Sequence, residues 1–114
     1  MNAPLPLSKY DPDKLHARIV ELGTTWAEAD GAASMLEETR KSVLAQYALK
    51  MPGNSATAKD TAALACEPYQ DHVRAMVAAR TKANRLRVEY EAGKQWIEMS
   101  RSLESTRRAE MTLR

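Results

Sequence analysis

Residues 15–47 read LHARIVELGTTWAEADGAASMLEETRKSVLAQY, and their apolar positions follow one helical repeat. One series, spaced by seven residues, consists of Leu15, Leu22, Ala29, Leu36 and Val43. A second series, offset by four residues and also spaced by seven, consists of Ile19, Trp26, Ala33, Arg40 and Tyr47, with Arg40 as its one charged member. Two such series are the core positions of a heptad repeat. The stretch therefore predicts a long amphipathic helix whose apolar seam packs against another helix.

Start and stop signals bound this first helix. Asp11 is a good N-cap, and Pro12 is tolerated in the first turn of a helix. Residues 51–54, Met-Pro-Gly-Asn, are a breaker followed by a turn. The sequence predicts an uninterrupted helix over 11–50 and a turn over 51–57.

A short helix and a second long helix are predicted after the turn. Ser55 or Thr57 can cap a helix over 58–66, and Pro68 must kink or break it because proline lacks the backbone N–H of the helical ladder. No breaker follows, so the second long helix is predicted over 68–111. Its seam consists of Met76, Ala83, Tyr90 and Ile97 and, three residues on, Ala79, Leu86, Gly93 and Ser100.

The two seams match when the chain folds back at the turn. In one antiparallel register, small side chains meet near the turn, and large side chains farther away meet each other or a glycine. The facing pairs are Leu36–Met76, Ala33–Ala79, Ala29–Ala83, Trp26–Leu86, Leu22–Tyr90, Ile19–Gly93 and Leu15–Ile97. The predicted fold is therefore all-α, a long coiled-coil-like antiparallel helical hairpin forming a single domain over 11–114, with a flexible arm over 1–10.

Composition and motifs argue against several classes of protein. Aromatic residues make up only 5% of the 114 residues, so a thick globular core is not expected. No apolar run reaches the roughly 20 residues of a membrane-spanning helix. The single cysteine, Cys66, excludes an internal disulfide and a multi-cysteine metal site. His16 and His72 fall far apart in the predicted register, and no catalytic or phosphate-loop motif is present. We expect a cytoplasmic protein that is no enzyme and has no metal, cofactor or membrane partner.

A second apolar line on the last helix predicts self-association. Two helices bury too little surface to be stable alone. We expect this line to lie beside the first seam. It consists of Val88, Ala92, Trp96, Met99 and Leu103. A homodimer that forms a four-helix bundle would cover it. The predicted oligomer interface consists of Val88, Trp96, Met99 and Leu103.

Charge is distributed unevenly along the chain. Residues 1–73 contain seven Lys/Arg against ten Asp/Glu, whereas residues 74–114 contain ten Lys/Arg against five Glu. Five of these cations are spaced by seven residues and form a basic stripe, Arg80, Arg87, Lys94, Arg101 and Arg108. Lys82 and Arg85 are expected to thicken its start and Arg107 its end. A ridge of this kind could follow a phosphate backbone.

The basic stripe also has a structural interpretation, and both remain open. Its positions fall beside the seam, where long basic side chains cover apolar surface and pair with acids of the facing helix. Asp30 and Glu37 are expected near Arg80, but the first helix offers little acid opposite the last three stripe residues. Three roles for the stripe therefore remain open: it flanks the bundle, binds nucleic acid or binds an acidic protein. Trp96 would contact the dimer partner or stack on a base.

The last helix also resembles part of a known group of proteins. The resemblance rests on NRLRVEYEA at 84–92, on Trp96 and on RRAEM at 107–111. These residues resemble the C-terminal helix of small uncharacterised helical proteins of phages and prophages, from replication and recombination gene clusters. The resemblance implies a viral context, the cytoplasm of a bacterial host and DNA metabolism, and it assigns no site residue.

The combined expectation is a non-enzymatic, homo-oligomeric helical accessory protein that contacts nucleic acid through the last helix. The predicted nucleic-acid-binding residues are Arg80, Lys82, Arg85, Arg87, Lys94, Arg101 and Arg108. The alternative is a protein–protein adaptor, a virion scaffold component or an inhibitor of a host protein, without nucleic-acid binding.

Overall fold

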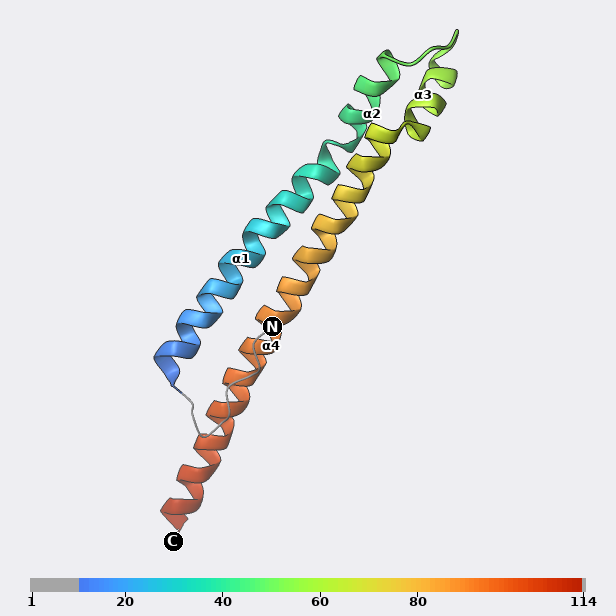
Figure 1. Cartoon of the computed structure of the whole chain (residues 1–114). Helices are drawn as coiled ribbons and strands as arrows, with labels where there is room; N and C mark the ends of the chain where they lie inside the picture. The colour runs from blue at the N-terminus through green and yellow to red at the C-terminus, as the bar shows by residue number, and fades with distance from the viewer. Residues whose placement is uncertain (1–10, 114) are drawn as a thin grey trace. The chain divides into compact units, whose positions relative to one another are not determined.

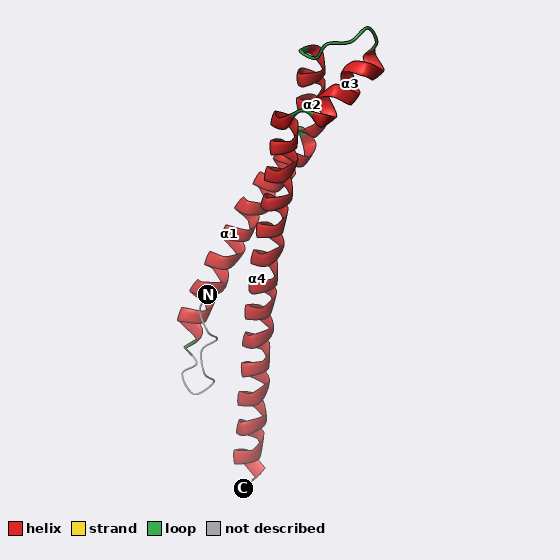
Figure 2. Cartoon of the chain, turned by 45° about the vertical axis from the view of Figure 1, so that its right-hand side comes forward, coloured by secondary structure: helices red, strands yellow, loops and turns green. Residues whose placement is uncertain are grey.

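The fold is all-α, as predicted. A computed structural model describes residues 11–113, and within that range there is no strand. The chain forms α1 (Pro12–Glu38), α2 (Arg40–Leu49), α3 (Ala56–Ala65) and α4 (Glu67–Leu113), joined by short loops (Figures 1 and 2). The predicted arm over 1–10 lies outside the described residues. None of the described helices is both long and apolar enough to cross a membrane.

Side-chain caps fix the starts of two helices. Asp11 Oδ1 accepts hydrogen bonds from the backbone N–H groups of Asp13 at 3.1 Å and Lys14 at 3.3 Å, so Asp11 is the N-cap of α1. Ser55 Oγ accepts from the N–H of Ala58 at 3.1 Å and caps α3. Because Ser55, rather than Thr57, is the cap, α3 begins two residues before the predicted start at 58.

The prediction of an uninterrupted helix over 11–50 is wrong, because the helix is interrupted at Thr39. The structure ends α1 at Glu38 and begins α2 at Arg40. The Thr39 hydroxyl donates to the carbonyls of Met35 at 2.8 Å and Leu36 at 3.3 Å, and His72 Nε2 donates to the Leu36 carbonyl at 3.0 Å. Side chains that donate to helical carbonyls compete with the backbone ladder, which accounts for the interruption.

The break expected at Pro68 is present. Cys66 lies between α3 and α4, and its backbone is extended, with φ −71° and ψ 145°. Pro68 then lies in the first turn of α4, where its missing N–H breaks no helical hydrogen bond. Helix α4 therefore starts one residue before the predicted position, and it ends at Leu113 rather than 111.

Two compact units make up the fold, and unit 1 contains residues 11–26 and 86–113. Its first part belongs to α1 and its second to α4, and the two run antiparallel. The predicted facing of Ile19 and Gly93 is confirmed, because a Cβ atom built on Gly93 would lie 2.5 Å from Ile19 Cδ1. The rings of Trp26 and Tyr90 pack with centroids 5.5 Å apart. All predicted seam positions of this unit are buried or half-buried, namely Leu15, Ile19, Leu22, Trp26, Leu86, Tyr90, Gly93, Ile97 and Ser100.

Unit 2 contains residues 27–85 and includes the turn of the hairpin. Ala33 of α1 and Ala83 of α4 are buried in its seam, and the close packing of helices uses such small side chains. Helices α2 and α3 pack against each other. The buried residues near the turn are Ala48, Ala63 and Tyr69.

The core is thin. Among the described residues, no large side chain is completely buried, and the least exposed residues are alanines. Several large apolar side chains remain in water instead, namely Val20, Met35, Leu49, Leu64, Val77, Val88, Met99, Leu103, Met111 and Leu113. Burial of apolar surface is the main stabilising term of folding. The hairpin therefore gains less stabilisation from apolar burial than its apolar side chains could provide.

Candidate functional site

The five residues of the basic stripe are all on α4, but not all in one unit. Arg80 belongs to unit 2, whereas Arg87, Lys94, Arg101 and Arg108 belong to unit 1. In an α-helix a step of seven residues falls only about 20° short of two full turns, so the stripe follows one side of the helix beside the seam.

Arg80 is held by acids of α1. Its Nε and Nη2 atoms donate to the two carboxylate oxygens of Glu37 at 2.9 and 2.8 Å, a bidentate pair. Its Nη1 donates to Asp30 Oδ1 at 2.6 Å, and Nη2 also donates to Ser34 Oγ at 3.3 Å. The prediction that Asp30 and Glu37 lie near Arg80 is confirmed. With its donors engaged, Arg80 links two helices and is not available to a phosphate.

The ion pair changes the proton affinity of both partners. The hydrogen bond from Arg80 holds the pKa of Glu37 below its ordinary value, against a smaller opposing effect of burial. The hydrogen bonds to Glu37 and then Asp30 raise the pKa of Arg80 further above its already high ordinary value. Both groups are therefore charged at neutral pH.

The four stripe residues of unit 1 are exposed and have few acidic partners. Arg108 lies 3.9 Å from Glu104 in an exposed pair, a separation at which surface ion pairs contribute little. Lys94 Nζ lies 5.2 Å from the centroid of the Tyr90 ring. Among the described residues, Arg87 and Arg101 have no carboxylate within ion-pair distance.

The difference between Arg80 and Lys94 follows from the sequence of α1. The two helices are antiparallel, so a step of seven residues forward on α4 corresponds to seven residues backward on α1. Lys94 comes two heptads after Arg80, and the α1 residues two heptads before Asp30 and Glu37 are His16 and Gly23. Neither is acidic, so unit 1 does not repeat the carboxylate site of Arg80.

Three further cations predicted to thicken the stripe lie on other faces of α4. Residues of an α-helix are separated by about 100° around its axis, so Lys82 is about 200° from Arg80 and Arg85 about 200° from Arg87. Arg107 is about 100° from Arg108 by the same rule. All three are exposed. The expectation that these three cations belong to the same surface as the basic stripe is therefore wrong. Because they lie on the same helix but outside the stripe, they are suitable positions for control variants.

The second apolar line of α4 is largely exposed. Val88, Met99 and Leu103 are 59%, 50% and 47% exposed, and Ala92 is exposed as well. Val88 and the seam residue Ile97 are nine residues apart, which is about 180° around the helix. Val88 therefore lies behind the seam, whereas Leu103, three residues after the seam residue Ser100, lies only about 60° from it. Trp96 lies at the border of the line and is half-buried.

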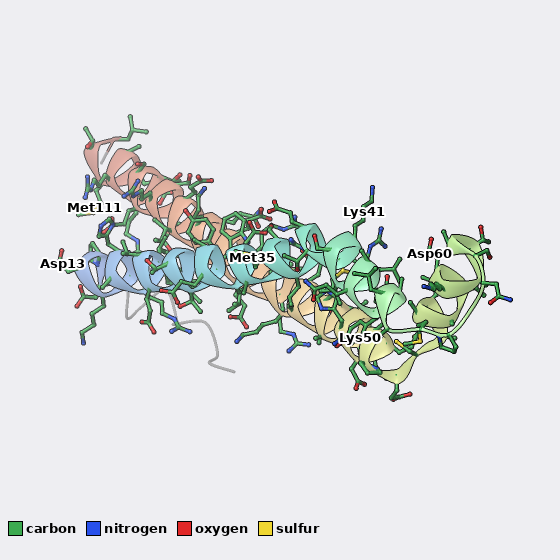
Figure 3. The ribbon with its side chains drawn as sticks, turned by 90° about the horizontal axis from the view of Figure 1, so that it is seen from above. Asp13, Met35, Lys41, Lys50, Asp60 and Met111 are labelled. Atoms are coloured by element: carbon green, nitrogen blue, oxygen red, sulfur yellow. The ribbon has the colours of Figure 1, made fainter. Side chains whose placement is uncertain are left out.

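The end of α4 is exposed on every side. Each residue over 101–113 is exposed, including Met111, which Figure 3 labels among the side chains. The seam ends at Ser100, which is buried and whose Oγ donates to the carbonyl of Trp96 at 2.9 Å. Arg101 and Arg108 thus belong to a part of the helix that has water on all faces.

The described residues contain no cluster of three or more His, Cys, Asp or Glu side chains that could hold a metal ion. His72 Nε2 donates to the Leu36 carbonyl at 3.0 Å, so this side chain links α4 to α1. Its structural role was not foreseen. The spacing of three and four residues that runs through Met76 and Ala79 extends back to His72 and Tyr69, and this extension would have placed His72 in the seam.

In comparisons with known proteins, no family model, curated protein or solved structure matches this chain. Its function is therefore argued from its own residues.

Proposed function

We propose that this chain is a non-enzymatic, homo-oligomeric helical accessory protein that contacts nucleic acid through Arg87, Lys94, Arg101 and Arg108 of α4. One observation carries the proposal. Two α1 carboxylates neutralise Arg80, whereas the four stripe residues of unit 1 are exposed and, among the described residues, have no α1 carboxylate within ion-pair distance. The seam with α1 ends at Ser100, so the comparison applies to Arg87 and Lys94. If these two cations only flanked the hairpin, acids on α1 would be expected beside them, as they are beside Arg80.

The spacing of these cations suits a polyphosphate. Arg87 and Arg108 are separated by 21 residues, or about 32 Å of helix at about 1.5 Å per residue. Each cation that neutralises a phosphate releases a condensed counterion, which favours binding at low salt. Contacts of this kind go to the backbone and carry no sequence information. We therefore propose binding without marked sequence preference.

The resemblance of the last helix to proteins of phage replication and recombination clusters adds support from a different direction. It places the proposed contact in a viral context, in the cytoplasm of a bacterial host. A small accessory protein of DNA metabolism is consistent with the exposed cations of α4.

The proposal is tested by fluorescence anisotropy with labelled single- and double-stranded oligonucleotides at low salt. We expect wild type to bind. Changing Lys94, Arg101 and Arg108 together to Gln removes three stripe cations and should weaken binding strongly, because phosphate contacts are lost. The helix should persist, since none of the three lies in the seam.

A matched control separates the stripe from net charge. Changing Lys82, Arg85 and Arg107 together to Gln removes the same charge from other faces of α4, and this variant should keep most of the affinity. Equal loss in both triple variants would show that only the net charge matters. Absence of binding by wild type would refute the proposal.

A second candidate function is that of a protein–protein adaptor, virion scaffold component or host-protein inhibitor. The exposed apolar line of α4 favours it, because large exposed apolar surfaces mark protein contacts. In that case wild type would not bind nucleic acid, and the triple stripe variant would behave as wild type in every assay.

A further inference from the structure

We propose that a second copy of this chain packs antiparallel against the outer line of α4, about a two-fold axis between Gln95 and Trp96. The outer line is defined here as Val88, Ala92, Met99 and Leu103, all of them exposed and all within about 60° of one another around α4. The proposal does not depend on nucleic-acid binding, because the basic stripe lies on a different side of the helix.

The spacing of the outer line is the same in both directions. Its four members are separated by four, seven and four residues. When two copies of the helix run antiparallel, Val88 of one copy faces Leu103 of the second, and Ala92 faces Met99 of the second. The reciprocal pairs form by symmetry, as in any two-fold interface.

The antiparallel pairs also fit in size. Each pair combines a smaller side chain with a larger one, so the interface can fill evenly. In a parallel arrangement Met99 would face Met99 and Ala92 would face Ala92, which would crowd one layer and leave a void in another. Both overpacking and voids oppose association.

A second copy is favoured as the occupant because this chain lacks a thick core of its own. No large side chain among the described residues is completely buried, and α1 covers only the seam side of α4. A two-fold contact lets one apolar line serve on both sides of the interface. Val88 and Leu103 are 15 residues apart, or about 22 Å along the helix, and a contact along one helix of this length would bury less than the roughly 800 Å² per partner of stable complexes. We therefore expect a dimer that dissociates on dilution.

Disulfide trapping tests both the occupant and its direction. In a Cys66→Ser background, which removes the single native cysteine, Ala92→Cys and Met99→Cys are made as separate proteins with tags of different length. In the antiparallel arrangement two copies of residue 92 are offset by about 10 Å along the axis, too far for a disulfide. The mixture should therefore form a disulfide-linked heterodimer several-fold more efficiently than either protein alone.

The control for random collision is Ser105→Cys, at an exposed position on another face of the same helix. Trapping of Ala92→Cys alone as efficiently as the mixture would overturn the antiparallel direction. Trapping of the mixture no better than Ser105→Cys would overturn the interface. The Lys94, Arg101 and Arg108 triple Gln variant should still be trapped, so failure of the nucleic-acid proposal would not affect this outcome.

Sedimentation provides a second, independent measurement. Val88→Gln with Leu103→Gln should weaken self-association about tenfold or more, because apolar side chains that the dimer buries become polar. The control, Met35→Gln with Met111→Gln, changes two equally exposed apolar residues away from the line and should leave association unchanged (Figure 3). Equal effects of the two double variants, or a wild-type protein that stays monomeric at high concentration, would contradict the proposal.

Discussion

Arg80 and Lys94 come from one seven-residue pattern, yet their surroundings give them different roles. Arg80 makes a bidentate pair with Glu37 and a further bond to Asp30, which fixes its guanidinium between two helices. Lys94 instead lies near the face of the Tyr90 ring, and a cation on a ring face remains able to meet an anion from the opposite side. The proposed division of the stripe into a structural part and a nucleic-acid-binding part rests on these two residues.

The Arg80–Glu37 pair should make stability depend on pH in acid. The pKa of Glu37 is lower in the folded protein than its ordinary value, so its contribution is present above that ordinary value and is lost as the pH falls through the folded pKa. Thermal melting should show Glu37→Gln below wild type at neutral pH, with the gap closing in acid. The gap should be modest because both side chains are partly exposed. Glu38→Gln is the neighbouring control, and a Glu37→Gln gap that stays constant with pH would contradict this account.

Gly93 and Gly31 should respond oppositely to alanine. A Cβ atom at Gly93 would meet Ile19 Cδ1 at 2.5 Å, whereas one at Gly31 would meet nothing within 4 Å. Alanine stabilises an exposed helix position by roughly 1 kcal/mol relative to glycine, but overpacking a contact costs about 1–3 kcal/mol. Urea unfolding should therefore place Gly31→Ala above wild type and Gly93→Ala at least about 1 kcal/mol below Gly31→Ala. Equal gains would mean that Ile19 does not face Gly93.

At the scale of the elements, the heptad spacing was sufficient to predict the hairpin and the facing of Ile19 and Gly93. The spacing reports which residues share a face, and Ile19 opposite Gly93 follows from it. The interruption at Thr39 could not be predicted in the same way, because it involves His72, a side chain more than thirty residues away. The faces of Lys82, Arg85 and Arg107 could have been assigned from helical geometry, since about 100° per residue separates them from the stripe.

The paired seams make a direct prediction about stability. Leu22 is 9% exposed in the seam, whereas Val20, two residues away on α1, is 54% exposed. Leu22→Asp would bury an unpaired charge and should destabilise the protein by roughly 3 kcal/mol or more, while Val20→Asp should change stability by about 0.5 kcal/mol or less. Melting followed by circular dichroism measures both. An unchanged midpoint for Leu22→Asp would show that the register is wrong.

At the scale of the whole molecule, charge is separated along the chain. The formal net charge is only +2, but residues 74–114 contain ten Lys/Arg against five Glu. Arg80, the one stripe cation in unit 2, is neutralised within the hairpin, and the four in unit 1 are left to water. On this account the seam side of α4 holds the hairpin together, its basic side meets phosphates and its outer side meets a second copy.

The salt dependence of nucleic-acid binding tests the proposed stripe most directly. Affinity for a duplex is measured by anisotropy over a range of salt concentrations for wild type and for the Lys94, Arg101 and Arg108 triple Gln variant. The slope of log affinity against log salt should be negative for wild type and should shrink in the variant by roughly 0.9 per lost phosphate contact, or about 2.7 in all. The Lys82, Arg85 and Arg107 variant should keep most of the wild-type slope. A wild-type slope near zero, or a slope that the stripe variant leaves unchanged, would contradict the account.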